Sequence, residues 1–130
     1  MRLLLDTHIF LWFITADARL SLGEQQAIRD GTNEVYLSVV SLWETVIKYQ
    51  LGKLPLPEAP EHFLPVQRER HQIASLPLDE ESVRYLARLP YLHRDPFDRI
   101  LVSQALALGL TLVTHDSLIR AYPVPLFSDT

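Results

Sequence analysis

Four acidic residues occur where a folded chain could bring their carboxylates together. Asp6 directly follows the apolar segment 3–5, and Asp116 closely follows a later one. Glu44 and Asp98 lie in the early turns of two predicted helices. Four like charges a few ångströms apart repel one another unless positive charge lies among them. Because all the donors are oxygens, the hard cations Mg²⁺ and Mn²⁺ are favoured over zinc or copper.

Short apolar segments alternate with helical patterns along the chain, which predicts an α/β fold. Helices of about ten residues between strands imply right-handed crossovers, and therefore a three-layer α/β/α arrangement with a mostly parallel central sheet. The expected strands are 3–5, 35–37, 73–76, 110–114 and 125–128. The expected helices are 8–14, 21–30, one from 38 or 41 to 51, 62–71, 79–89, 95–108 and 117–122.

In an open parallel sheet, ligand sites form beyond the carboxyl ends of the strands. The acids that follow the strands are therefore expected to meet at one edge of the sheet. Each also has a structural explanation. Asp6 suits a turn or a helix cap, and Asp95 followed by Asp98 imitates a capping box at a helix start.

Glu44 stands in an otherwise apolar row of its predicted helix. The pattern places Val39 and Trp43 on the buried side of this helix and Glu44 at its border. A carboxylate in such a place needs a partner. An ion pair with Lys48 or an arginine is one solution, and a metal ion is the other.

Composition limits the class of protein. The 130 residues are 48% hydrophobic and 22% charged, which predicts one folded domain over 1–130. With no cysteine, disulfides and thiolate metal sites are excluded, and a cytoplasmic location is expected. No apolar stretch approaches the ~18 residues of a membrane span. A net charge of −4 argues against nucleic-acid binding through a broadly positive surface, unless bound cations offset the acids.

Four sequence blocks in this order resemble the PIN-domain family, and within it the VapC-like toxins of type II toxin–antitoxin pairs. The resemblance extends over nearly the whole chain. The blocks are Leu3-Leu-Leu-Asp6-Thr7-His8, Ser41-Leu-Trp-Glu44 running to Gly52-Lys-Leu54, Arg94-Asp-Pro-Phe-Asp98-Arg99, and Leu112-Val-Thr114-His-Asp116.

The resemblance implies a metal-dependent endoribonuclease that cleaves RNA phosphodiesters. Its catalytic and metal-binding acids would be Asp6, Glu44, Asp98 and Asp116, with Mg²⁺ as the ion and Mn²⁺ as its substitute. Accessory positions would be Asp95, Thr7 and Thr114, and of these Asp95 is expected to act mainly as a helix cap. The family also implies an antitoxin that covers the acidic site, and a homodimer.

Contacts to RNA phosphates are expected from Arg94 and Arg99, which flank the Asp98 block, because arginine binds phosphate bidentately. Trp12 and Trp43 occupy helical core positions and are expected to pack rather than to stack on bases. The apolar helix that contains Trp12 either presents one side to another protein or is buried in the core.

Other functions remain to be weighed. A response-regulator receiver needs a lysine after its last strand, whereas the last lysine here is Lys53. A haloacid-dehalogenase-type phosphatase needs Asp-x-Asp after strand one, whereas this chain has Asp6-Thr7-His8. The alternative that stays open is a non-catalytic PIN-like binding module whose acids are structural.

Overall fold

The computed structural model describes residues 1–129 and is built on a four-stranded sheet. The strands are β1 (Arg2–Leu5), β2 (Glu34–Ser38), β3 (Ala74–Leu76) and β4 (Thr111–Val113). Their order in the sheet is β3-β2-β1-β4, and every neighbouring pair is parallel. The predicted α/β class with a parallel sheet is confirmed.

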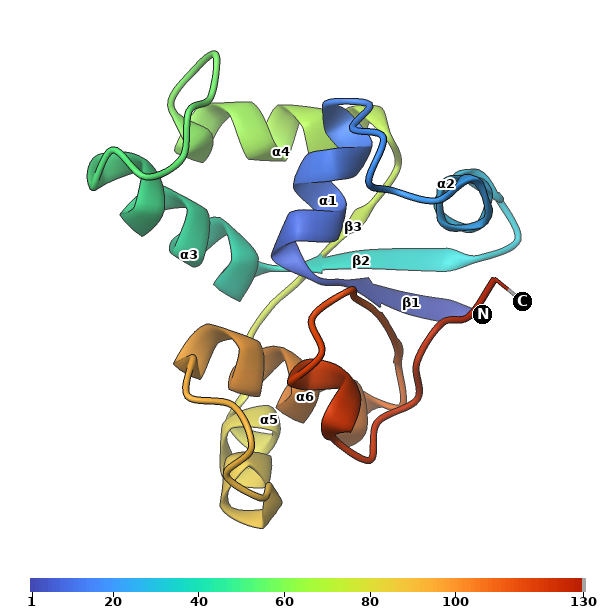
Figure 1. Cartoon of the computed structure of the whole chain (residues 1–130), viewed down its shortest axis with the longest axis vertical. Helices are drawn as coiled ribbons and strands as arrows, with labels where there is room; N and C mark the ends of the chain where they lie inside the picture. Colours follow the sequence, from blue (N-terminus) through green and yellow to red (C-terminus); the bar gives the residue numbers. More distant parts are fainter. Residues whose placement is uncertain (130) are drawn as a thin grey trace.

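Helices cover both faces of this sheet (Figure 1). The α-helices are α1 (Thr7–Ile14), α2 (Leu22–Arg29), α3 (Val39–Gln50), α4 (Pro60–Arg70), α5 (Glu80–Tyr85) and α6 (Pro96–Leu108), and the 3₁₀ turns are η1 (Leu86–Arg88) and η2 (Ile119–Ala121). In Figure 1, α1, α2 and α4 lie on one side of the sheet, and α5 and α6 lie on the other. None of the helices within residues 1–129 combines the length and the apolar character that a membrane crossing requires.

Several predicted boundaries were wrong. The expected strand 125–128 forms a single bridge, Leu112 to Leu126, in which Leu112 N–H donates to Pro125 and Phe127 N–H donates to Leu112. Pro125 has no N–H and so cannot extend this pairing toward Leu110. The helix expected over 79–89 is α-helical only to Tyr85 and continues as η1. The helix expected over 117–122 is the 3₁₀ turn η2 alone, and α4 begins two residues early, at Pro60, where a missing N–H costs nothing.

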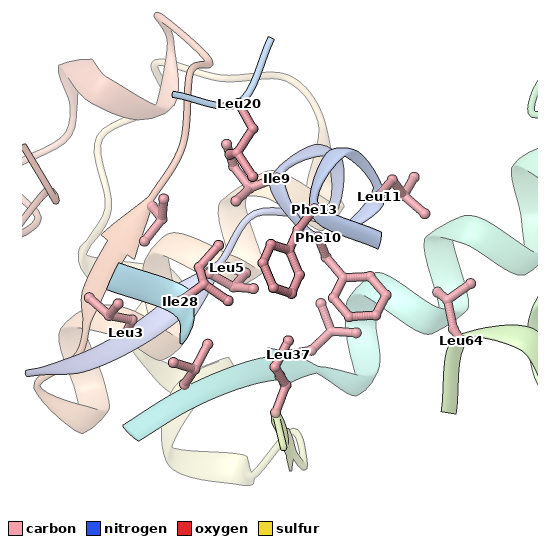
Figure 2. Packing of buried hydrophobic residues seen from close by; sticks show 13 residues of the cluster. Leu3, Leu5, Ile9, Phe10, Leu11, Phe13, Leu20, Ile28, Leu37 and Leu64 are labelled. Carbon is pink, nitrogen blue, oxygen red and sulfur yellow. The ribbon is translucent and has the colours of Figure 1, made fainter. Parts of the chain in front are cut away.

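Alternating side chains of the central strand build two cores. Leu3 and Leu5 pack with α1, α2 and α4, whereas Leu4 packs against α6 on the opposite face. Figure 2 shows the first core, with Phe10 and Phe13 of α1 directed toward the strands. Most of the apolar surface of α1 is therefore core, and of the two explanations offered by the sequence, burial is correct.

The order of the strands decides where a site can form. The chain runs outward from β1 to β2 and β3, and then returns to place β4 on the other side of β1. The carboxyl ends of β1 and β4 therefore flank the point where the direction of winding changes, and such points open a crevice. Ser38 caps α3, and its hydroxyl donates to Gln104 of α6 over 2.6 Å, which fixes both helices beside this crevice.

Candidate active site

A cavity of about 480 Å³, called the acidic pocket below, opens at these strand ends. Asp6 enters it from the junction of β1 and α1, and Asp116 from the loop after β4. Glu44 of α3 and Asp98 in the first turn of α6 complete its acidic wall. The structure thus brings together all four acids that the sequence singled out.

Asp6 is the most deeply buried of the acids in the pocket whose pKa is shifted. Its side chain is part of a residue that is only 4% exposed, and its Oδ2 accepts a hydrogen bond of 2.8 Å from Thr114 Oγ1. Its Oδ1 is buried and has no hydrogen-bond partner among residues 1–129. Burial raises the pKa of Asp6, although the Thr114 hydroxyl acts in the opposite direction. One buried carboxylate oxygen is therefore left for a ligand outside the chain.

Glu44 is held by two donors within the chain. Thr7 Oγ1 donates to its Oε1 over 2.8 Å, and Lys48 Nζ lies 2.6 Å from its Oε2. Burial acts to lower the pKa of Lys48, but the hydrogen bond and charge of Glu44 outweigh it and the pKa is raised. The ion pair that the sequence offered as the structural role of Glu44 is thus present, at the wall of the pocket.

The orientation predicted for α3 was wrong. Its buried residues are Val40, Ser41, Glu44 and Thr45. Val39 is exposed, and Trp43 is 57% exposed with its ring edge-on to Phe97 at 4.9 Å between centroids. The helix therefore buries a largely polar strip, of which Glu44 lines the pocket. Val39 and Trp43 face the surface, whereas Leu42 is partly buried against the first core.

Asp98 also has a strongly raised pKa. Burial, followed by the charge of Asp6, raises its pKa to about 8. Asp95 accepts backbone N–H bonds from Phe97 and Asp98, so it caps α6 as expected, while it also lines the pocket. A neutral carboxyl at Asp98 would become an anion if a cation entered the pocket.

His93 is a member of the site that the sequence reasoning missed. It is buried, and its Nε2 lies 3.0 Å from Asp98 Oδ2 and 3.2 Å from Asp116 Oδ2. The backbone N–H of Asp95 donates to its Nδ1. Since Nδ1 accepts, the N–H of the ring is on Nε2, which faces one side-chain oxygen each of Asp98 and Asp116. His93 is therefore a donor that orients the acids, and its Nε2 also lies within 4.8 Å of one carboxylate oxygen each of Asp98 and Asp116, a group that could hold a metal ion.

Asp116 contrasts with Asp6 and Asp98. Burial acts to raise its pKa, but the backbone N–H of Ile119 and the His93 ring outweigh this and the pKa is lowered. Its Oδ1 accepts from the backbone N–H groups of Leu118 and Ile119 and so starts η2. Its own N–H donates to Thr114 Oγ1, the hydroxyl that donates to Asp6. One threonine thus couples the acids at the ends of β1 and β4.

The two arginines expected at RNA phosphates lie outside this wall. Within residues 1–129, neither Arg94 nor Arg99 lines the acidic pocket. Arg94 is exposed, whereas Arg99 donates to the carbonyl of Pro90 and the hydroxyl of Tyr122. That hydroxyl also accepts from the backbone N–H of His93, so Arg99 helps to hold the loop that carries His93. No short motif marks Tyr122, whose role depends on a contact 29 residues away.

The donor set fits a hard divalent cation. Carboxylates from four separate segments line one pocket, and Asp6 Oδ1 is buried without a partner. Two of the acids, Asp6 and Asp98, have raised pKa values because burial and neighbouring negative charge disfavour their anions. A bound cation would remove that penalty, and oxygen donors suit hard divalent cations.

Comparison with known proteins bears on the family. The model of the PIN domain family matches residues 3–124. Over 67 residues the chain is 39% identical to ribonuclease VapC16 of Mycobacterium tuberculosis, a match that covers 51% of this chain and 45% of that protein. The matched part thus spans less than half of the length of this curated relative.

Solved structures share the fold. A chain in the crystal structure of VapBC2 from Rickettsia felis bound to a promoter DNA fragment superposes with a TM-score of 0.73 at 20% identity, covering 98% of both chains. A chain of VapBC-1 from nontypeable Haemophilus influenzae superposes with a TM-score of 0.69 at 17% identity, covering 99% of this chain and 98% of the other. At such low identity these matches concern the arrangement of helices and strands.

Proposed function

Because this chain belongs to the PIN-domain family, we propose that it is a divalent-metal-dependent endoribonuclease that acts as the toxin of a toxin–antitoxin pair. The observation that carries this proposal is the convergence of Asp6, Glu44, Asp98 and Asp116 on one pocket, with a buried oxygen of Asp6 left unpaired. A relative named as a ribonuclease, and fold neighbours from VapBC complexes, support the same function.

The four acids would hold Mg²⁺, or Mn²⁺ in its place. When bound, the ion supplies the Lewis acidity that polarises a phosphodiester and activates water. Thr114 fixes the orientation of Asp6, and Thr7 fixes that of Glu44, each through a hydroxyl bond of 2.8 Å. These bonds determine which carboxylate oxygens remain free to face the pocket.

His93 and Asp116 complete the arrangement around the phosphodiester. The N–H of His93 is shared by the side chains of Asp98 and Asp116, each of which lies within hydrogen-bond distance of it. This shared donor keeps the two side chains close together. Asp116 has a lowered pKa and lies nearer to solvent than Asp6, so it remains an anion at neutral pH. We assign Asp116 the orientation of the attacking water, a role that needs an acceptor rather than a strong base.

The partners follow from the same surfaces. An antitoxin that places cationic side chains in the acidic pocket would offset its charge and exclude RNA. A second copy of the chain would cover the apolar side chains of Val39 and Trp43, which α3 leaves exposed. A cytoplasmic location is part of the same proposal.

The test is cleavage of a mixed RNA pool by the purified protein with Mg²⁺, with Mn²⁺ and with a chelator. Asp6→Asn and Asp98→Asn should each abolish cleavage, because each removes a negative ligand while keeping the side-chain shape. Glu58→Gln is the matched control, since it removes one charge from an exposed loop residue. The absence of both cleavage and Mn²⁺-induced thermal stabilisation would refute the proposal and support the binding-module alternative.

A further inference from the structure

One wall of the acidic pocket is built from aromatic and cationic side chains rather than acids. Trp12 of α1 is half-buried and lines the pocket together with Arg19 from the following turn. The Arg19 guanidinium carbon lies 4.8 Å from the centroid of the Trp12 ring, so the cation stacks on the indole face. We call this pair of side chains the Trp12–Arg19 shelf.

The shelf is fixed from both sides. Asp17 accepts from Arg19 Nε over 3.0 Å and from Nη2 over 2.8 Å, which sets the plane of the guanidinium. The backbone N–H of Asp17 donates to the carbonyl of Trp12, which brings the turn back over the ring. On the other side, His115 packs edge-on to Trp12 at 5.2 Å, and Glu24 holds the imidazole through bonds of 2.7 and 2.9 Å.

These contacts leave part of Arg19 free. The guanidinium lies over the Trp12 ring, and the side of the fork formed by Nε and Nη2 is occupied by Asp17. The side chain is nevertheless 67% exposed and lines both the acidic pocket and a neighbouring cavity of about 360 Å³. The free parts are therefore the outer face of the planar cation and the N–H groups of Nη1, between two hollows of the surface.

The chemistry of that face selects a nucleobase over a phosphate. A phosphate binds the N–H edge of a guanidinium, but here that edge is partly occupied and a carboxylate lies beside it. Unpaired bases stack on aromatic rings and on guanidinium planes whatever their sequence. Trp12 behind Arg19 extends the stack, and its contact with His115 limits rotation of the ring.

We infer that the Trp12–Arg19 shelf binds an unpaired nucleobase of single-stranded RNA, next to the phosphodiester held in the acidic pocket. This inference rests on the proposed ribonuclease function and adds the subsite that orients the strand. Trp12 packs against the first core, as expected, and the inference adds a second role for its ring. The second cavity, lined by Leu54, Pro55 and Leu56, continues the path beyond the shelf.

The test uses Trp12 as its own reporter. The chain has two tryptophans, so Trp43→Phe leaves Trp12 as the sole tryptophan. In this background, a short oligoadenylate is titrated in the presence of Ca²⁺, and an abasic strand of equal length supplies the same phosphates without bases. The shelf predicts quenching of Trp12 by the oligoadenylate and roughly tenfold to hundredfold weaker binding of the abasic strand.

Arg19→Lys separates stacking from charge. It keeps the cation but loses the plane, so oligoadenylate affinity should fall roughly tenfold or more while abasic-strand affinity stays unchanged. Equal binding of the two strands, or full affinity in Arg19→Lys, would overturn the inference, as would no oligonucleotide binding at all. Cleavage of the RNA pool by the unaltered protein is scored separately, so cleavage without base-dependent binding refutes the shelf alone. Base-dependent binding without cleavage refutes the nuclease alone.

Discussion

Replacing Asp98 with asparagine should stabilise the metal-free protein at neutral pH, although it removes a proposed metal ligand. The pKa of Asp98 is raised from 3.8 to about 8, mainly by burial and by the charge of Asp6. The raised pKa corresponds to at most about 6 kcal/mol against the ionised form. Because the side chain borders an open pocket, solvent screening lowers this figure, and we expect about 2 kcal/mol, or roughly 6 °C in Tm.

The sign of the pH dependence follows from the raised pKa. Below about pH 4 the carboxyl of Asp98 is protonated in both the folded and the unfolded chain, so the metal-free protein and Asp98→Asn should differ little. As the pH rises toward about 8, the unfolded chain loses this proton first, and the unsubstituted protein loses stability. The stability advantage of Asp98→Asn should therefore grow across this range.

Thermal unfolding in chelator from about pH 4 to about pH 8, with Glu58→Gln as the charge-matched control, measures this difference. Added Mn²⁺ should reverse the order, because the ion stabilises the protein that retains the carboxylate. This prediction would be refuted if Asp98→Asn were no more stable than the unsubstituted protein at neutral pH, or if the difference in stability did not change with pH. Either result would show that the folded chain does not disfavour the Asp98 anion.

Other substitutions test separate parts of the site. Lys48→Met should lower the free energy of unfolding in urea by about 2–3 kcal/mol, because it removes the cation paired with the buried Glu44. Mn²⁺ should reduce this loss of stability, and an equal loss with and without Mn²⁺ would contradict the role of Glu44 as a metal ligand. His93→Gln should weaken Mn²⁺ binding roughly 10- to 100-fold by calorimetry, since Asp98 loses its orienting donor, and unchanged affinity would exclude this role. Gly109→Ala should lower the free energy of unfolding by about 1 kcal/mol in thermal unfolding, because an alanine is strained at a φ of +68°. The affinity for Mn²⁺ should not change, since this effect is local.

Local sequence patterns were sufficient for the elements that local forces define. The capping box of Ser21 and Glu24 forms at the start of α2, and Gly52 and Gly109 adopt positive φ where helices end. The apolar run after Arg2 becomes the buried central strand. Such features depend on a few neighbouring residues, so a sequence determines them before the chain folds.

The acidic wall was also within reach of the sequence. Asp6 and Asp116 follow parallel strands, and parallel strands end at one edge of a sheet, so topology alone brings these acids together. The unusual place of Glu44 in an apolar row was a second signal. The predicted orientation of α3 was wrong in detail, because apolar periodicity does not reveal that hydrogen bonds let Ser41, Glu44 and Thr45 be buried.

Contacts between distant segments were decided only by the tertiary structure. The ring of His93 meets Asp116 across 23 residues, and His115 meets Glu24 across 91. The stacking of Arg19 on Trp12 depends on a turn that no periodic pattern describes. The sequence therefore determined which strands and acids form the site. Hydrogen-bond geometry and ring packing between separate elements, which have no signature along the chain, decided how those acids are oriented and what lies beside them.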